Sequence, residues 1–161
     1  MGLLDRLTRR RGPDPLGDGV WRRAHDRFLR AVERVHQVAS GPDEDAEVTE
    51  RLIAVAASLG RLLPQVGAVC AAAQAAAPSA GLDVPSGGGG RFLDVHRALS
   101  KAAGLAAQAA EAATMARIEV GAGDAAAAGA RAGAAERSAA GARDLVLRAE
   151  ALLTPPAPPV S

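Results

Sequence analysis

Aromatic side chains and strongly basic stretches are scarce in this sequence of 161 residues. It has one tryptophan, two phenylalanines and no tyrosine, and its net charge at pH 7 is only +1. So few aromatic rings cannot form a platform on which nucleic-acid bases would stack, and the balanced charge gives no broad basic field for a phosphate backbone. We therefore expect no nucleic-acid partner.

Cysteine occurs once, at Cys70, which excludes a disulfide framework. A chain of this length can bury a core without disulfides or a structural metal. The neighbours of Cys70, VGAVCAAAQ, are apolar and provide no positive charge that would activate the thiol. We expect a buried, unreactive thiol rather than a catalytic nucleophile.

Strand patterns and long hydrophobic runs are also missing. Apolar and polar residues never alternate for more than a few positions, so no sheet is expected. The longest stretch without a charged side chain covers residues 62–82, but it contains two prolines and two glutamines and is rich in alanine. Its hydrophobicity is too low for a convincing membrane span.

Alanine, with 40 residues, and arginine, with 18, dominate the composition, as expected of a GC-rich bacterial genome. Apolar residues recur at spacings of three and four, which is the pattern of helices that pack as in a coiled coil. Between Gly and Pro breaks, this pattern predicts helices at about 18–40, 43–77, 91–120 and 124–153. The predicted fold is all-α: an elongated antiparallel four-helix bundle with alanine-rich seams.

Several residues mark the expected ends of these helices. Asp18 is expected to cap the first helix, and Pro64 predicts a kink at about 60–64 in the second. The sequence GAGD at 121–124 separates the third helix from the fourth, although one continuous helix over 91–153 is the alternative. Trp21 and Phe28 make the first helix the bulky part of a core that is otherwise thin.

The predicted domain layout has three parts: a basic N-terminal segment and linker (1–17), one bundle domain (18–154) with a flexible loop (78–90), and a Pro-rich tail (155–161). The first segment is amphipathic and could lie on an anionic membrane surface. Its candidate residues are Leu3, Leu4, Leu7, Arg6, Arg9, Arg10 and Arg11. A frayed leader or a short docked helix is the alternative, because so short a segment is marginal as an isolated helix.

Glu33 and His36 have the E-x-x-H spacing that places a carboxylate and an imidazole on one helix face, as in ferritin-like di-iron bundles. Such a site needs a second E-x-x-H and two further glutamates. The third histidine, His96, is preceded at that spacing by Leu93, so the set is incomplete. We expect no metal and no cofactor, and we expect His25 to be a half-buried polar residue of the core seam.

These observations predict a non-enzymatic, cytoplasmic protein that acts through protein–protein association, as a homo-oligomer or as an adaptor. The expected interaction surface is Val66, Val69, Ala73, Ala76, Leu105 and Ala109, from two runs of low charge. One alternative is a peripheral protein at the inner face of the membrane, anchored by residues 1–11. The other is a metal-binding ferritin-like bundle. No small-molecule substrate is inferred.

Overall fold

The computed structural model describes residues 14–42 and 44–154, and every regular element within them is helical. The elements are α1 (Val20–Ala39), α2 (Ala46–Gly60), α3 (Leu63–Ala76), the short 3-10 turn η1 (Gly88–Gly90), α4 (Arg91–Gly121) and α5 (Ala125–Leu153). The all-α class is therefore confirmed. The predicted N-terminal amphipathic segment and the Pro-rich tail lie outside the described residues.

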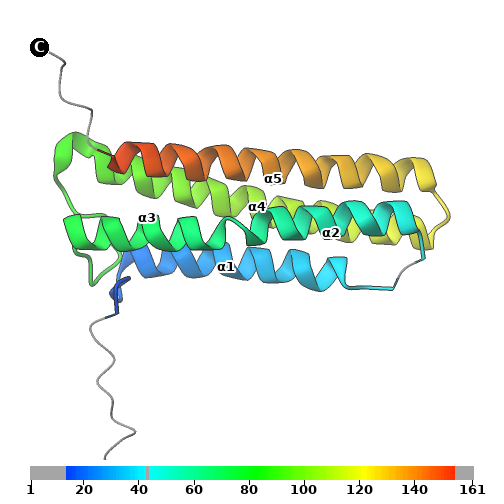
Figure 1. Ribbon diagram of the computed structural model, residues 1–161, viewed down its shortest axis with the longest axis horizontal. Helices are drawn as coiled ribbons and strands as arrows, with labels where there is room; N and C mark the ends of the chain where they lie inside the picture. The colour runs from blue at the N-terminus through cyan, green and yellow to red at the C-terminus, as the bar shows by residue number, and fades with distance from the viewer. Residues whose placement is uncertain (1–13, 43, 155–161) are drawn as a thin grey trace, which may run out of the picture.

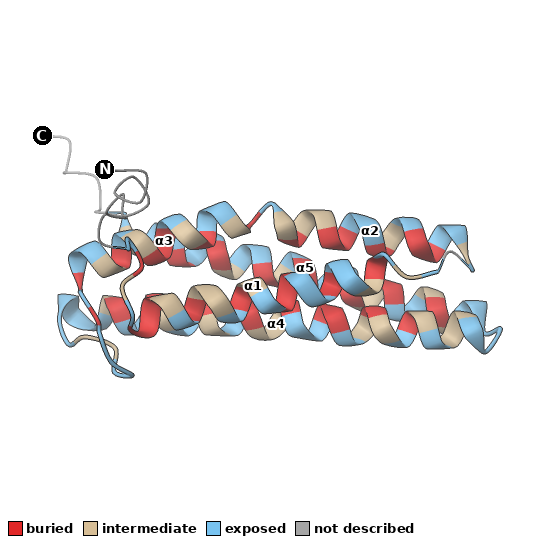
Figure 2. Cartoon of the chain, turned by 90° about the horizontal axis from the view of Figure 1, so that it is seen from below, coloured by how far each residue is buried: buried red, intermediate tan, exposed pale blue. Residues whose placement is uncertain are grey.

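The helices pack side by side as a bundle. α2 and α3 follow one another along one rod, and successive rods run in opposite directions (Figure 1). α1 packs against the α2–α3 rod and against α4, while α5 packs against α4 and against the same rod. The buried residues lie along the helix sides that face one another (Figure 2).

The break between α2 and α3 follows from Pro64, the second residue of α3. Proline has no N–H to donate to the carbonyl of Gly60, so the α-helical hydrogen-bond ladder cannot continue across this point. α2 ends at Gly60, and the N–H of Leu62 instead donates to the carbonyl of Leu59. The predicted interruption at 60–64 is confirmed.

The boundary between α4 and α5 is set by Gly123, whose φ of 78° lies in the left-handed region that favours glycine. The N–H of Gly123 donates to the carbonyl of Val120, and the N–H of Asp124 donates to that of Glu119. This pair of bonds is the Schellman arrangement that ends helices. The Asp124 carboxylate then accepts from the N–H of Ala127 and starts α5. The structure thus has two helices here and excludes the continuous one.

The start of α1 differs from the prediction, because Asp18 is exposed and does not cap the helix. The N-cap position is held by Gly19, and the N–H of Val20 donates instead to Oγ of Ser79 at 3.3 Å. Ser79 is buried in the loop that follows α3. The hydroxyl of Ser79, which lies 59 positions after Val20, thus takes the capping role that was expected of the Asp18 carboxylate.

The bulkiest buried side chains include Trp21 and Phe28 of α1, as predicted, and both are fully buried. The Trp21 indole N–H donates to the carbonyl of Ala77 at 2.9 Å, and its ring meets that of Phe92 edge to face at 6.5 Å. The buried positions of α5 are alanine except for Val146. His25 of α1 is half-buried, as expected.

The end of α1 is held by Arg117 of α4, which sequence reasoning missed. Its guanidinium donates to the carbonyls of Ala39 at 2.9 Å and Pro42 at 2.7 Å, and to Oγ1 of Thr49 at 2.8 Å. The last carbonyls of a helix have no partner within that helix, so these bonds satisfy groups that would otherwise need water. Arg117 thereby joins the end of α1 to the beginning of α2.

Replacing Trp21 should show how far the fold depends on this one side chain. Trp21→Ala removes a fully buried ring and should lower the free energy of unfolding by about 3–5 kcal/mol. Trp21→Phe keeps much of the ring but leaves the Ala77 carbonyl without its donor, which costs about 1–3 kcal/mol. Urea unfolding followed by circular dichroism measures both values. An unchanged urea midpoint for Trp21→Ala would contradict the role of the Trp21 ring as a large part of the buried core.

Two glycine-to-alanine changes should have opposite effects. A Cβ at Gly19 would collide with the backbone carbonyl of Ser79, which cannot move without releasing the start of α1, so Gly19→Ala should destabilise the protein. Gly104 lies inside α4 with no such neighbour within 4 Å. Gly104→Ala should therefore stabilise the helix by about 0.5–1 kcal/mol. Thermal unfolding of both variants is the measurement, and a shift in the same direction for both would contradict the packing at Gly19.

Candidate interaction surface

The two predicted metal-ligand candidates, Glu33 and His36, are both exposed on α1. The His36 ring leans toward α2, since a Cβ placed on Gly60 would lie 3.1 Å from its Nε2 atom. Within residues 14–42 and 44–154, no three His, Cys, Asp or Glu side chains are grouped so that they could hold a metal ion. The described structure brings no further ligand to the E-x-x-H pair.

Cys70 is fully buried in α3, and this burial raises the pKa of its thiol to about 12. A thiol with so high a pKa carries almost no thiolate at neutral pH, and the thiolate is the reactive form. The side chain therefore belongs to the core and not to a reactive site.

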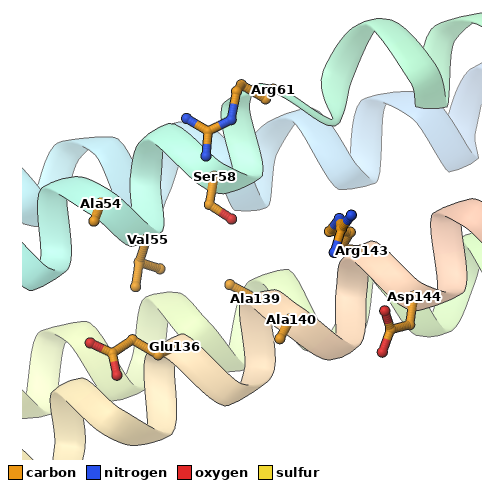
Figure 3. Close-up of a pocket in the computed structure, with 9 residues that line it drawn as sticks. All are labelled: Ala54, Val55, Ser58, Arg61, Glu136, Ala139, Ala140, Arg143 and Asp144. Atoms are coloured by element: carbon orange, nitrogen blue, oxygen red, sulfur yellow. The ribbon is translucent and has the colours of Figure 1, made fainter.

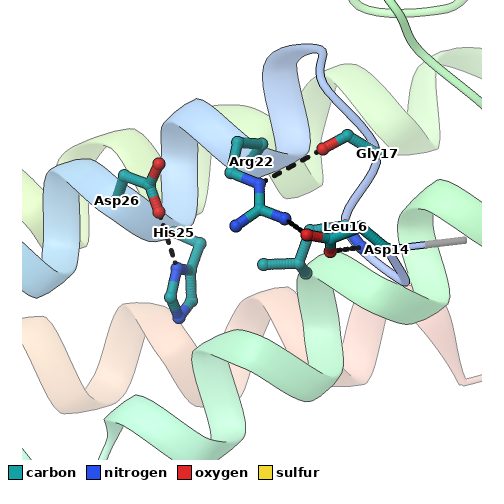
Figure 4. A network of polar contacts seen from close by, with 6 residues as sticks. All are labelled: Asp14, Leu16, Gly17, Arg22, His25 and Asp26. Atoms are coloured by element: carbon teal, nitrogen blue, oxygen red, sulfur yellow. Dashed lines mark hydrogen bonds and ion pairs between the residues drawn. The ribbon is translucent and has the colours of Figure 1, made fainter. Parts of the chain in front are cut away.

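A polar network surrounds the first turns of α1 (Figure 4). The Arg22 guanidinium forms an ion pair with Asp14 and donates from Nε to the carbonyl of Gly17 at 3.2 Å. One turn further, Nδ1 of the half-buried His25 lies 3.0 Å from Oδ1 of Asp26. These contacts fasten the chain before α1 to the helix and leave His25 paired with a neighbour on its own helix.

An open groove of about 700 Å³ lies between α2 and α5, next to the break at Arg61 (Figure 3). Its residues are Ala54, Val55, Ser58, Arg61, Glu136, Ala139, Ala140, Arg143 and Asp144. Arg51 donates to both carboxylate oxygens of Glu136, at 2.7 and 3.0 Å, and this hydrogen bonding lowers the pKa of Glu136. One acidic group of the groove is therefore already paired within the chain.

A second open groove, of about 480 Å³, lies between α1 and α4. We call it the arginine groove, and its residues are Arg27, Arg30, Ala31, Glu33, Arg34, Gln37, Ala103 and Ala107. Ala31 and Ala103 are buried at its base, and the three arginines lie along α1 at spacings of three and four, which places them on one face. None of the ion pairs found among the described residues involves these arginines.

The interaction surface expected from the sequence is mostly interior. Its members Val66, Val69, Ala73 and Ala109 are buried. Leu105 is half-buried and Ala76 is exposed. α3, which carries Val66, Val69 and Ala73, packs chiefly against α1 and α5. The four buried side chains contact the chain's own helices, and the two grooves described above are among the open surfaces between helices.

The stretch Ala46–Ala76, which comprises α2 and α3, is long and apolar enough to cross a membrane by length and composition, with a mean hydropathy of 1.6 in its best window. It includes most of the uncharged run that we judged too weakly hydrophobic. Of the most apolar part of this stretch, 39% is buried inside the bundle. Core helices of soluble proteins can be equally long and apolar. The stretch is thus weak evidence for a membrane span.

Known proteins give no guide to the use of these grooves. No protein-family model, curated protein or solved structure matches this chain. Function is therefore inferred from the geometry and charge of the described residues. The sequence did contain a signal for the arginine groove, since Arg23, Arg27, Arg30 and Arg34 recur at helical spacing.

The half-buried His96 of α4 should make stability depend on pH. Burial, and then the charge of Arg27, lower its pKa from the ordinary value of 6.5. Below pH 6.5 the histidine becomes protonated in the unfolded chain but stays neutral in the folded one. The free energy of unfolding should therefore decrease as the pH is lowered, until the pH reaches the lowered pKa of His96 in the folded state.

Urea unfolding at about pH 7 and about pH 5.5 should therefore show a smaller loss of stability for His96→Gln than for the natural chain. His36→Gln changes an exposed histidine and is the control, which should keep the full loss. An equal loss in the natural chain and in His96→Gln would show that another group causes the pH dependence.

Proposed function

We propose that this protein is a non-enzymatic, elongated antiparallel four-helix bundle with alanine-rich seams, and that it acts through association with protein, as an adaptor or a homo-oligomer. The observation that carries the proposal is the arginine groove, an open cleft between two helices with Ala31 and Ala103 at its base. Small side chains let another helix approach closely, because the distance between packed helices depends on the side chains at the contact.

A cytoplasmic location without cofactor is part of this proposal. The single cysteine, Cys70, is free and buried, which is compatible with a reducing compartment. The competing function is binding to a membrane surface through residues 1–11, which lie outside the described residues. The two functions differ in what the chain binds, so they can be separated with the full-length protein.

The association proposal predicts an assembly larger than the 16.2 kDa of one chain. Size-exclusion chromatography of a gentle extract from the native cell, with the chain detected by antibody, should give an apparent mass larger than that of one chain. Light scattering of the purified chain then distinguishes a homo-oligomer, which stays large, from an adaptor, which becomes a monomer. Compact reference proteins and the purified chain calibrate the column, because an elongated shape alone raises the apparent mass. The proposal fails if the chain elutes as a monomer in both samples.

Flotation with anionic liposomes tests the competing function. Under the association proposal, neither the full chain nor a variant lacking residues 1–11 should float with the vesicles. Flotation of the full chain alone would replace the proposed function by the membrane one. The deletion leaves all described residues intact, and circular dichroism checks that the shortened chain is still helical.

A further inference from the structure

The arginine groove has a charge that nothing in the described structure neutralises. Arg27, Arg30 and Arg34 line it together with a single acid, Glu33, which leaves a net charge of +2 by formal count. Asp26, the other acid on this part of α1, faces His25 instead. Arg27 also lies near α4, since its charge, after burial, helps to lower the pKa of His96, which precedes the groove on that helix.

The wall opposite these arginines is apolar and shallow. α4 contributes only Ala103 and Ala107 to the groove, and the nearest acid on α4, Glu111, follows Ala107 by one helical turn. With Arg23 one turn before Arg27, the basic row extends for about 16 Å along α1, at 1.5 Å of rise per residue. That length matches three turns of a second helix lying in the groove.

We propose that the arginine groove binds an acidic amphipathic helix of a partner protein. The apolar side of that helix would lie on Ala31, Ala103 and Ala107, and carboxylates spaced by three and four residues along its edge would meet the arginines. Planar guanidinium groups bind carboxylates through two parallel hydrogen bonds, which gives such a contact geometric specificity. The inference rests on the proposed function and names the chemistry of its partner.

Other occupants fit these observations less well. A second copy related by two-fold symmetry would bring one basic row against another, which opposes like charges. A nucleic acid would find no aromatic side chain among the groove residues on which to stack a base. For a membrane, the large exposed apolar residues of α4 are Leu93, Met115 and Ile118, and all three lie outside the groove.

Photo-crosslinking of the full chain in its native cell tests the proposal. A diazirine amino acid replaces Gln37, an exposed residue at the end of the groove, and mass spectrometry identifies the peptide that becomes attached. We expect a segment of another protein with Asp or Glu at helical spacing. An adduct with lipid, with nucleic acid or with a second copy of this chain would overturn the proposal, as would a protein segment without that acidic pattern.

Charge reversal shows whether the arginines hold the partner. Arg27→Glu, Arg30→Glu and Arg34→Glu together should lower the yield of the adduct by at least about tenfold. In an extract of the same cells, about 0.5 M salt should lower the yield from the chain that keeps these arginines. The matched control reverses three exposed arginines of α5, Arg131, Arg137 and Arg148, and should keep the yield. An equal loss in both triple variants would refute a specific role of the groove.

A milder variant keeps this test valid if the reversed protein does not fold. Arg27→Gln, Arg30→Gln and Arg34→Gln preserve helix propensity and remove only the charge. Circular dichroism checks that each variant is folded, and the glutamine variant should also lose the adduct. A full yield from the folded glutamine variant would contradict the proposal.

A second crosslinker position separates this inference from the proposed function. The diazirine residue replaces Ala54, which is exposed in the α2–α5 groove. Protein adducts from position 54 without any from position 37 would refute the arginine groove and leave protein association in place. No adduct from either position, together with a monomeric chain in the extract, would refute both.

Discussion

The alanine contact between α4 and α5 is the constraint on which the rest of the bundle depends. Most buried positions of α4 and all but one of α5 are alanine, so the two backbones can lie close together. Each alanine removes little apolar area from water, and the stabilisation scales with that area at roughly 25 cal/mol per Å². Larger contributions come from bulky side chains, among them Trp21 and Phe28, which are fully buried in α1.

Because α1 carries so much of the core, both of its ends are fixed by residues from elsewhere in the chain. Ser79 accepts from the first N–H, and the Ala77 carbonyl accepts from the Trp21 indole. At the other end Arg117, from α4, binds carbonyls that α1 leaves open. The contacts of Ser79 and Ala77 hold the start of α1 against the segment that follows α3, whereas the Arg117 contacts hold its end against α4, on one side of the arginine groove.

The sequence predicted the features that depend on local chemistry. Pro64 and Gly123 act on their own turns, so the break and the helix boundary could be located from the residue type, and the three-four spacing identified most core positions. The capping by Ser79 and Arg117 could not be predicted, because both residues act on segments more than 50 positions away. An uncharged run likewise does not reveal which helix covers it, and Val66, a residue of the expected interaction surface, is buried in the bundle.

The arginine groove follows from the same alanine-rich packing. In bundles of helices, charged residues beside the apolar seam often face residues of opposite charge on the next helix. Here the row formed by Arg27, Arg30 and Arg34 faces Ala103 and Ala107 on α4, whose short side chains offer no carboxylate. Guanidinium groups cannot enter the core without a partner, because burying an unpaired charge is costly. They therefore stay exposed at the edge of the groove, where the proposed acidic helix would meet them.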